Sequence, residues 1–166
     1  MAKLVVQDDI TMPMLLRTAR QTYAAAIREE LIANGLEDLP RNGPFVIRAM
    51  EHSSTPLSEI ARDLSVSKQA ASKLIDLLVV RGFLERTADP ADRRRITLAL
   101  TGRGRDAAAA VEAGTRRVDA DLADALSSTQ LAGFRAGLRA LVELSKRYAT
   151  PEYDGSNARL VRRGRG

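Results

Sequence analysis

Residues 57–104 read LSEIARDLSVSKQAASKLIDLLVVRGFLERTADPADRRRITLALTGRG, and this segment has the most distinctive pattern of the chain. Its first eight residues have apolar positions three and four apart, which predicts a short helix. Ser65-Val66-Ser67 follows as a turn, and Ser67 is a natural N-cap for a longer helix that ends at Gly82. Two helices joined by so short a turn are typical of a helix-turn-helix. The inward face of the second helix is predicted to comprise Leu74, Ile75 and Leu78.

The period of the pattern changes after Gly82. Residues 83–87 and 95–100 are strand-like, and Ile96, Leu98 and Leu100 alternate along the second segment. Between the two segments lies ADPADRR, a charged and turn-forming sequence. Together the two strands and their tip predict a wing.

Two helical patterns precede this unit. Residues 11–33 have apolar side chains at helical spacing and end at Asn34-Gly35, a left-handed C-cap. A second helix is expected after Asn42-Gly43-Pro44 and ends near His52. Its predicted inward residues are Phe45, Val46, Ala49 and Met50.

Two long helical patterns follow the wing, over residues 101–126 and 129–148. Their apolar positions recur at three and four residues, so each helix has an apolar face. The helix-turn-helix and wing are too small to bury both of these apolar faces. We therefore expect that a second copy of the chain covers them.

The chain is therefore predicted to be mainly α with a small β wing: a winged helix-turn-helix plus long dimerisation helices. We expect a single domain over residues 1–150, with dimerisation helices at 8–35 and 101–148 and a DNA-binding lobe at 40–100. No regular structure is expected in the basic tail, residues 151–166. The tail arginines either add non-specific attraction to phosphates or keep the chain end soluble; they are Arg159, Arg162, Arg163 and Arg165.

Composition excludes several classes of function. The chain has no cysteine and one histidine, His52, so we predict no metal site and no cofactor. A phosphate-binding glycine loop and a nucleophile paired with histidine are missing from the sequence, so an enzyme is not expected. The N-terminal MAKLVVQDD lacks a signal-peptide layout, and no apolar run approaches the ~20 residues that span a bilayer, which favours a cytoplasmic protein.

Positive charge gathers in the helix-turn-helix and wing. The whole chain carries a net +5, and residues 57–105 carry 10 basic and 6 acidic groups, a net +4. Such a concentration is typical of a surface that faces a polyanion, although a solvated basic face would look the same by charge alone.

The run 57–104, with DPADRRR, an alternating strand and then Leu100-Thr101-x-x-Gly104, resembles the winged helix-turn-helix of the multiple antibiotic resistance regulator (MarR) family. The order of the flanking helices is similar to the same family, so the resemblance covers about residues 8–148. It departs at Ser65, where the family often has glycine, and at Ala71, where a larger aliphatic residue is frequent. The resemblance implies a homodimer that represses genes from a pseudo-palindromic operator until a small ligand releases it.

Candidate DNA contacts lie on the recognition helix and its turn. Lys68, Gln69, Ser72 and Lys73 share the face opposite Leu74 and Leu78, where glutamine suits adenine and lysine suits guanine or phosphate. The alternative is that these four side chains are only solvent-exposed polar residues of a surface helix. The hydroxyls at helix ends or in the turn are phosphate candidates, and Ser67 could equally be only a cap; they are Ser58, Ser65 and Ser67.

At the wing tip, Asp92 is placed to hold an arginine through a carboxylate pair. By resemblance, Arg94 is the side chain inserted into the minor groove, and Arg93 and Arg95 contact phosphate or support the loop. A soluble turn is the alternative for these three arginines.

A ligand cavity between the DNA-binding lobe and the dimerisation helices is a separate hypothesis. Its predicted lining is Met14, Arg17, Tyr23, Phe45, Met50 and His52. In this hypothesis His52 or Arg17 anchors an anionic phenolic or other aromatic ligand. Residues at this spacing also suit a plain core, and an architectural DNA-binding winged-helix protein without ligand control is the alternative function.

Overall fold

The computed structural model describes residues 10–52, 66–88 and 96–148. Its elements are α1 (Met12–Ala33), α2 (Gly43–His52), α4 (Lys68–Val80), β1 (Leu84–Ala88), β2 (Ile96–Leu100), α5 (Gly102–Ala125) and α6 (Ser128–Tyr148). This arrangement confirms the predicted mainly α fold with a small β wing. The predicted helix at 57–64, the wing tip and the basic tail lie outside the described residues.

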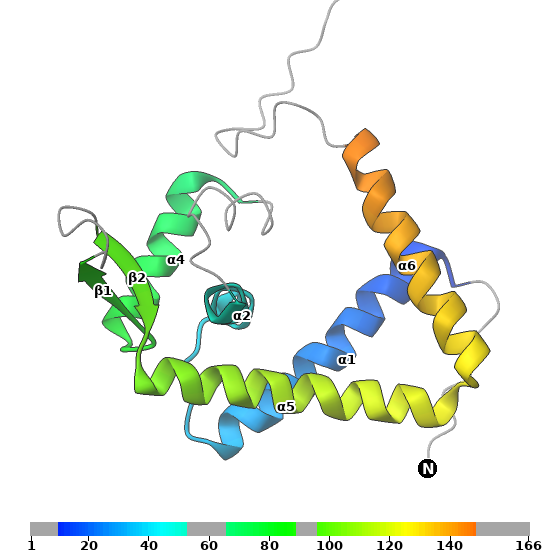
Figure 1. Cartoon of the computed structure of the whole chain (residues 1–166), viewed down its shortest axis with the longest axis horizontal. Helices are drawn as coiled ribbons and strands as arrows, with labels where there is room; N and C mark the ends of the chain where they lie inside the picture. The colour runs from blue at the N-terminus through cyan, green and yellow to red at the C-terminus, as the bar shows by residue number, and fades with distance from the viewer. Residues whose placement is uncertain (1–9, 53–65, 89–95, 149–166) are drawn as a thin grey trace, which may run out of the picture.

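Helix α5 runs along the length of the molecule (Figure 1). α4 and the two strands lie at one end of α5, α6 rises from the other end, and α1 crosses it in between. α2 packs against α5 and β2, so the DNA-binding lobe predicted from sequence is a cluster of short elements around the N-terminal part of α5.

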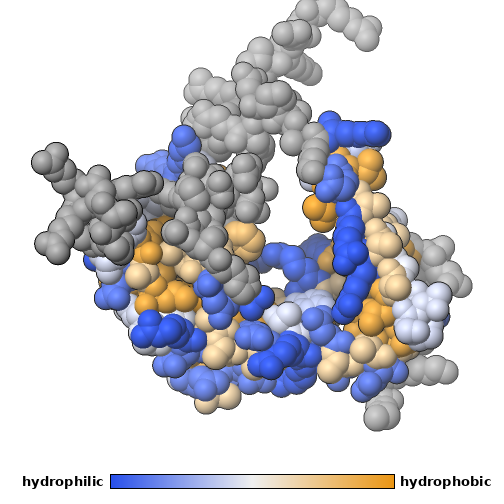
Figure 2. Space-filling view, viewed as in Figure 1, coloured by the Kyte–Doolittle hydropathy of each residue, from blue (hydrophilic) through white to orange (hydrophobic). Residues whose placement is uncertain are grey.

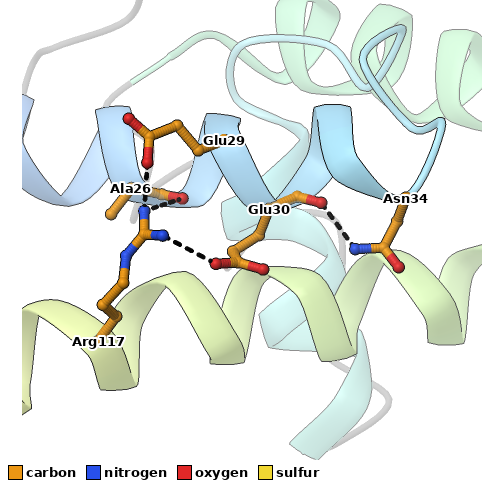
Figure 3. A network of polar contacts seen from close by, with 5 residues as sticks. All are labelled: Ala26, Glu29, Glu30, Asn34 and Arg117. Atoms are coloured by element: carbon orange, nitrogen blue, oxygen red, sulfur yellow. Dashed lines mark hydrogen bonds and ion pairs between the residues drawn. The ribbon is translucent and has the colours of Figure 1, made fainter.

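Glycine allows the close crossing of α1 and α5. A methyl group on Gly114 of α5 would lie 2.6 Å from the Cα atom of Ile27 in α1, nearer than real Cβ contacts. One turn further, Arg117 donates to the carboxylates of Glu29 at 2.5 Å and Glu30 at 3.1 Å, and to the Ala26 carbonyl oxygen (Figure 3). Tight backbone contact and a branched ion pair therefore fix the angle between the two helices.

The inward face of α2 differs from the prediction. Val46 and Ile47 are both 0% exposed and belong to the core, whereas Phe45, expected inside, is 40% exposed. Three consecutive apolar residues in a helix of ten leave its rotation undetermined by sequence, because each of them can start the buried stripe. Ala49 and Met50, also expected inside, are only partly buried.

The end of α4, the start of β1 and the start of α5 are packed together. Gly82 has φ +73°, which ends α4 as predicted, and Phe83 after it is fully buried. Thr101 caps α5 by accepting from the Gly104 amide at 3.0 Å and donates its hydroxyl to the Gly82 carbonyl at 2.5 Å. A methyl group on Gly104 would overlap the Phe83 carbonyl oxygen. The Thr101-x-x-Gly104 sequence therefore joins the wing and α4 to α5.

Helix α6 begins with a reciprocal cap. The Ser127 hydroxyl accepts from the Gln130 amide at 3.3 Å, and the Gln130 side chain accepts from the Ser127 amide at 3.0 Å. Beyond this cap α6 packs weakly on its own chain, and every described side chain in it is exposed or only partly buried. The described residues therefore leave its apolar face largely uncovered.

Candidate nucleic-acid interface and adjoining cavity

The recognition helix α4 has a buried face and an exposed polar face. Ala71, Ile75 and Leu78 are 0%, 4% and 0% exposed. Leu74 packs against the same core from a partly buried position. The predicted inward face is therefore confirmed, and Ala71 packs inward although it is smaller than the family's frequent residue.

The opposite face carries the side chains that sequence analysis selected. Lys68, Gln69 and Lys73 are exposed, and Ser72 is partly buried. All four lie in the first two turns of α4, so one docking movement brings them to the same ligand surface. Their roles in DNA contact stay predictions.

Ser67 is the N-cap of α4. Its hydroxyl oxygen accepts from the Ala70 amide at 3.2 Å. A hydroxyl that accepts in this way keeps its own hydrogen for a second partner such as a phosphate oxygen. The cap predicted for this residue is thus confirmed, and a phosphate contact is compatible with it.

The wing is a two-stranded antiparallel sheet fixed to α4. β1 pairs with β2 in the register Leu84 with Leu100 through Ala88 with Ile96. Arg86 of β1 donates to Asp76 of α4 at 2.5 Å, with both side chains about half exposed. Because an ion pair joins strand to helix on the outer surface, wing and recognition helix are presented as one surface.

Several predicted DNA contacts fall outside the part of the chain that the structure describes. They are Ser58, Ser65, Asp92, Arg93, Arg94 and Arg95. Strand β1 ends before the segment that holds the four wing residues, and β2 begins after it.

A cavity of about 660 Å³ lies between α1, the α1–α2 loop and the start of α2. Among the described residues, three arginines line it, one from the loop and two from α1, together with one acidic residue, Glu37. We call it the arginine cavity; its lining includes Arg20, Arg28, Arg41, Tyr23, Phe45, Ile27 and Leu39.

The structure does not gather the six predicted pocket residues in one place. Tyr23 and Phe45 line the arginine cavity. Met50 lines a separate cavity of about 520 Å³ beside β2 and α5. Met14, 58% exposed, and Arg17 lie on the exposed N-terminal half of α1. The side chain of His52 is outside the described part of the chain.

Comparison with known proteins places this fold. The sequence model of the MarR family matches residues 38–95, from the α1–α2 loop through α4 and β1 to the residue before β2. A solved structure titled as that of MarR is 25% identical and covers 86% of this chain and 95% of its own, with a TM-score of 0.65. Residues 38–95 therefore match the MarR family, and the described fold is that of MarR-family winged-helix proteins. No curated protein matches its sequence.

Two further MarR-like structures share the fold. FabT of Streptococcus pneumoniae, solved in complex with DNA, is 19% identical, with 82% of this chain and 97% of FabT covered and a TM-score of 0.64. MepR of S. aureus, solved with ethidium bromide, is 18% identical, with 82% and 98% covered and a TM-score of 0.55. At these identities the likeness concerns the fold.

One polar contact joins the arginine cavity to α5. The Tyr23 hydroxyl, on the cavity wall, donates to Asp119 at 2.6 Å. This hydrogen bond and partial burial raise the pKa of Tyr23 to about 12, while the positive charge of Arg135 in α6 opposes the shift. Tyr23 therefore keeps its proton at physiological pH and holds the cavity wall to α5.

Sequence reasoning missed the arginines of the cavity. It selected Arg17, whereas Arg20, Arg28 and Arg41 line the space. Arg20 and Arg28 are eight residues apart, close to two full helical turns, and so share one face of α1. That spacing could have predicted that Arg20 and Arg28 line the same cavity. No such pattern marks Arg41, because the position of a loop residue depends on tertiary folding.

Two observations concern other classes of site in the described residues. No helix there is apolar for long enough to cross a membrane. No three carboxylate or histidine side chains in the same residues lie close enough together to bind a metal ion.

Proposed function

We propose that this protein is a homodimeric transcriptional regulator that binds a pseudo-palindromic operator in double-stranded DNA, acts as a repressor, and is released by a small anionic ligand. The match of residues 38–95 to the MarR family supports a role in transcriptional regulation through DNA binding. The observation that carries the proposal is the exposed polar face of α4 beside the wing, backed by a fully packed inner face.

In the proposed complex, the first turns of α4 enter the major groove. Gln69 is suited to a bidentate pair with adenine, which discriminates by about 1–3 kcal/mol. Lys68 contacts guanine or phosphate, Lys73 contacts phosphate, and Ser72 supports them at the partly buried edge. FabT, which has the same fold, was solved in complex with DNA, and this supports the proposal that the present fold binds DNA.

In this proposal the wing contacts the minor groove of the DNA. Arg94 inserts into the minor groove and Asp92 orients a neighbouring arginine, while Arg93 and Arg95 hold phosphates. The ion pair between Arg86 and Asp76 supports the proposal, because it lies where β1 packs against α4 and so places the strands of the wing beside the recognition helix.

Dimerisation is supported by uncovered apolar surface at one end of the chain. Large apolar side chains of α1 and α6 are at least 37% exposed; they include Met12, Met14, Leu15, Leu16, Phe134, Leu141, Val142, Leu144 and Tyr148. Figure 2 shows apolar surface along much of α6, on the right of the view. A soluble single chain rarely exposes that much contiguous apolar area, so a second copy is the proposed cover.

Ligand control is supported by the charge of the arginine cavity. Three arginines against one glutamate favour an anion, and Tyr23 and Phe45 add aromatic walls. MepR, by contrast, was solved with ethidium, a cation. A panel of aromatic carboxylates that neither raises the melting temperature nor releases DNA would remove this part of the proposal.

The experiment is a binding titration on a duplex selected from a random pool, with a scrambled duplex at matched salt. Gln69→Ala should weaken binding to the selected duplex by about 5–100-fold and leave the scrambled duplex nearly unchanged, because a base contact carries sequence information. Lys73→Ala should weaken both equally and reduce the salt slope by about one.

The matched control is Arg116→Ala, which removes one positive charge from an exposed position of α5. Its affinity should stay within about twofold for both duplexes. If selection enriches no site and Gln69→Ala changes nothing, the protein binds DNA as an architectural factor, and operator reading is wrong.

A further inference from the structure

Asp38 joins three segments that are far apart in the sequence. Its carboxylate accepts from Arg103 at 2.6 Å, and its backbone carbonyl accepts from the guanidinium of Arg81. Arg103 also donates to the Arg81 carbonyl at 2.9 Å. Asp38 belongs to the α1–α2 loop, Arg81 caps the C-terminus of α4, and Arg103 lies in the first turn of α5. We call these three residues the Asp38 junction.

Arg103 is held in a fixed position at this junction. Its guanidinium carbon lies 4.5 Å from the centre of the Phe83 ring, and Phe83 is fully buried. A guanidinium over an aromatic face is attracted by the ring's electron density. Because Thr101 donates to the Gly82 carbonyl and Gly104 lies against the Phe83 backbone, the end of α4 and the start of α5 form one packed unit. Asp38 attaches the α1–α2 loop to that unit.

The residues beside Asp38 line the arginine cavity. Glu37 precedes it, and Leu39, Pro40, Arg41 and Asn42 follow it along the cavity wall. Residues 37–42 therefore form part of the cavity wall and also attach the α1–α2 loop to α4 and α5. A molecule that occupies the cavity and displaces this wall must also displace Asp38, because one residue of backbone leaves little slack between them.

We propose that Asp38 is a positioning residue that transmits occupancy of the arginine cavity to the recognition helix α4. With the cavity empty, the Asp38 junction holds the C-terminus of α4 in the orientation that reads DNA. An occupant that moves the wall weakens the pair between Asp38 and Arg103 and frees the end of α4. The effect on DNA rests on the proposed function, whereas the link between wall and helix does not.

The test uses a covalent occupant, so it does not depend on knowing the natural ligand. The chain has no cysteine, and Asn42→Cys gives one attachment point on the cavity wall. Reaction with N-phenylmaleimide then places an aromatic group at the cavity. The labelled protein is compared in two backgrounds, with Asp38 intact and with Asp38→Asn. Arg116→Cys, on the exposed surface of α5, is the matched labelling control.

The first readout is hydrogen exchange at the amides of Arg81, Gly82 and Phe83, which donate to carbonyl groups in the last turn of α4. With Asp38 intact, the label on Asn42→Cys should speed this exchange about tenfold or more. With Asp38→Asn, exchange should be fast before labelling, and the label should add less than about twofold. An equal effect in both backgrounds, or none in either, overturns the proposal.

The second readout is affinity for the selected duplex. The label should weaken binding about fivefold or more with Asp38 intact and less than about twofold with Asp38→Asn. Asp38→Glu keeps the carboxylate and should restore most of the response. If exchange responds as expected but no duplex is preferred, the proposed function fails and the link stands. If a duplex is preferred but exchange does not respond, the link alone is wrong.

Discussion

At its N-terminal end, α5 packs so tightly that Gly104 leaves no space for a methyl group beside the Phe83 backbone. At its C-terminal end, the chain turns into α6, where Phe134 and Leu141 are 43% and 42% exposed. One end is closed by the chain's own contacts, and the other presents an uncovered apolar face. The difference is between a lobe packed by its own chain and an apolar face that the proposed second copy would cover.

The largest effect is expected at the open end. Phe134 and Leu141 are seven residues apart on one stripe of α6, so Phe134→Asp with Leu141→Asp puts two charges into the proposed dimer contact. The variant should sediment as a single chain and lose about 100-fold or more in affinity for the selected duplex, because two half-sites are no longer bound together.

The control for this variant is Arg139→Ala on another face of α6, which should remain a dimer with unchanged affinity. A double variant that stays dimeric would show that the uncovered stripe of α6 is not where the second copy binds.

A smaller effect is expected at the closed end. Gly104→Ala forces the start of α5 away from Phe83 and should lower the free energy of unfolding by about 2–3 kcal/mol, as overpacked sites do. Urea unfolding measures it. Gly102→Ala is the matched control two residues earlier, where the nearest side-chain atom is 4.0 Å away, and should change stability by less than about 0.5 kcal/mol. Equal values for the two variants would contradict tight packing at Gly104.

The smallest effect concerns Tyr23, whose pKa is raised from 10.0 to about 12 by its bond to Asp119 and by burial. The folded chain holds this proton more tightly than the unfolded chain. The resulting stabilisation is complete below about pH 10 and declines as pH rises towards 12. Tyr23→Phe should therefore lose less stability than the unmodified protein between about pH 9 and about pH 11.

Urea midpoints at the two pH values measure this difference. Tyr148→Phe, at a position 80% exposed, is the control and should follow the unmodified protein. A parallel decline for Tyr23→Phe would mean that the bond to Asp119 does not contribute in solution.

Element order and helix ends were predictable because their signals are local. Asn34-Gly35, the Ser67 cap and Gly82 each act within a few residues, and the structure confirms all three. The exposed face of α4 followed from the positions of Ile75 and Leu78 in the same helix. Which bases those side chains contact stays a prediction, since a chain without DNA does not test it.

Contacts between distant segments were not predictable. Asp38 and Arg103 are 65 residues apart, and no periodicity relates a loop residue to the first turn of a later helix. The rotation of α2 was missed for a similar reason, because burial of Ile47 rather than Phe45 is decided by packing against α5 and β2. The arginine cavity depends on how the α1–α2 loop folds back on α1, which the sequence pattern did not specify.

The most direct measurement is the mass of the complex between the full chain, 18.1 kDa, and its selected duplex, obtained by native mass spectrometry. We expect two chains per duplex, and a selected sequence with two related halves about one helical turn apart. One chain per duplex at undiminished affinity would contradict the proposal that two copies of the chain together bind one operator.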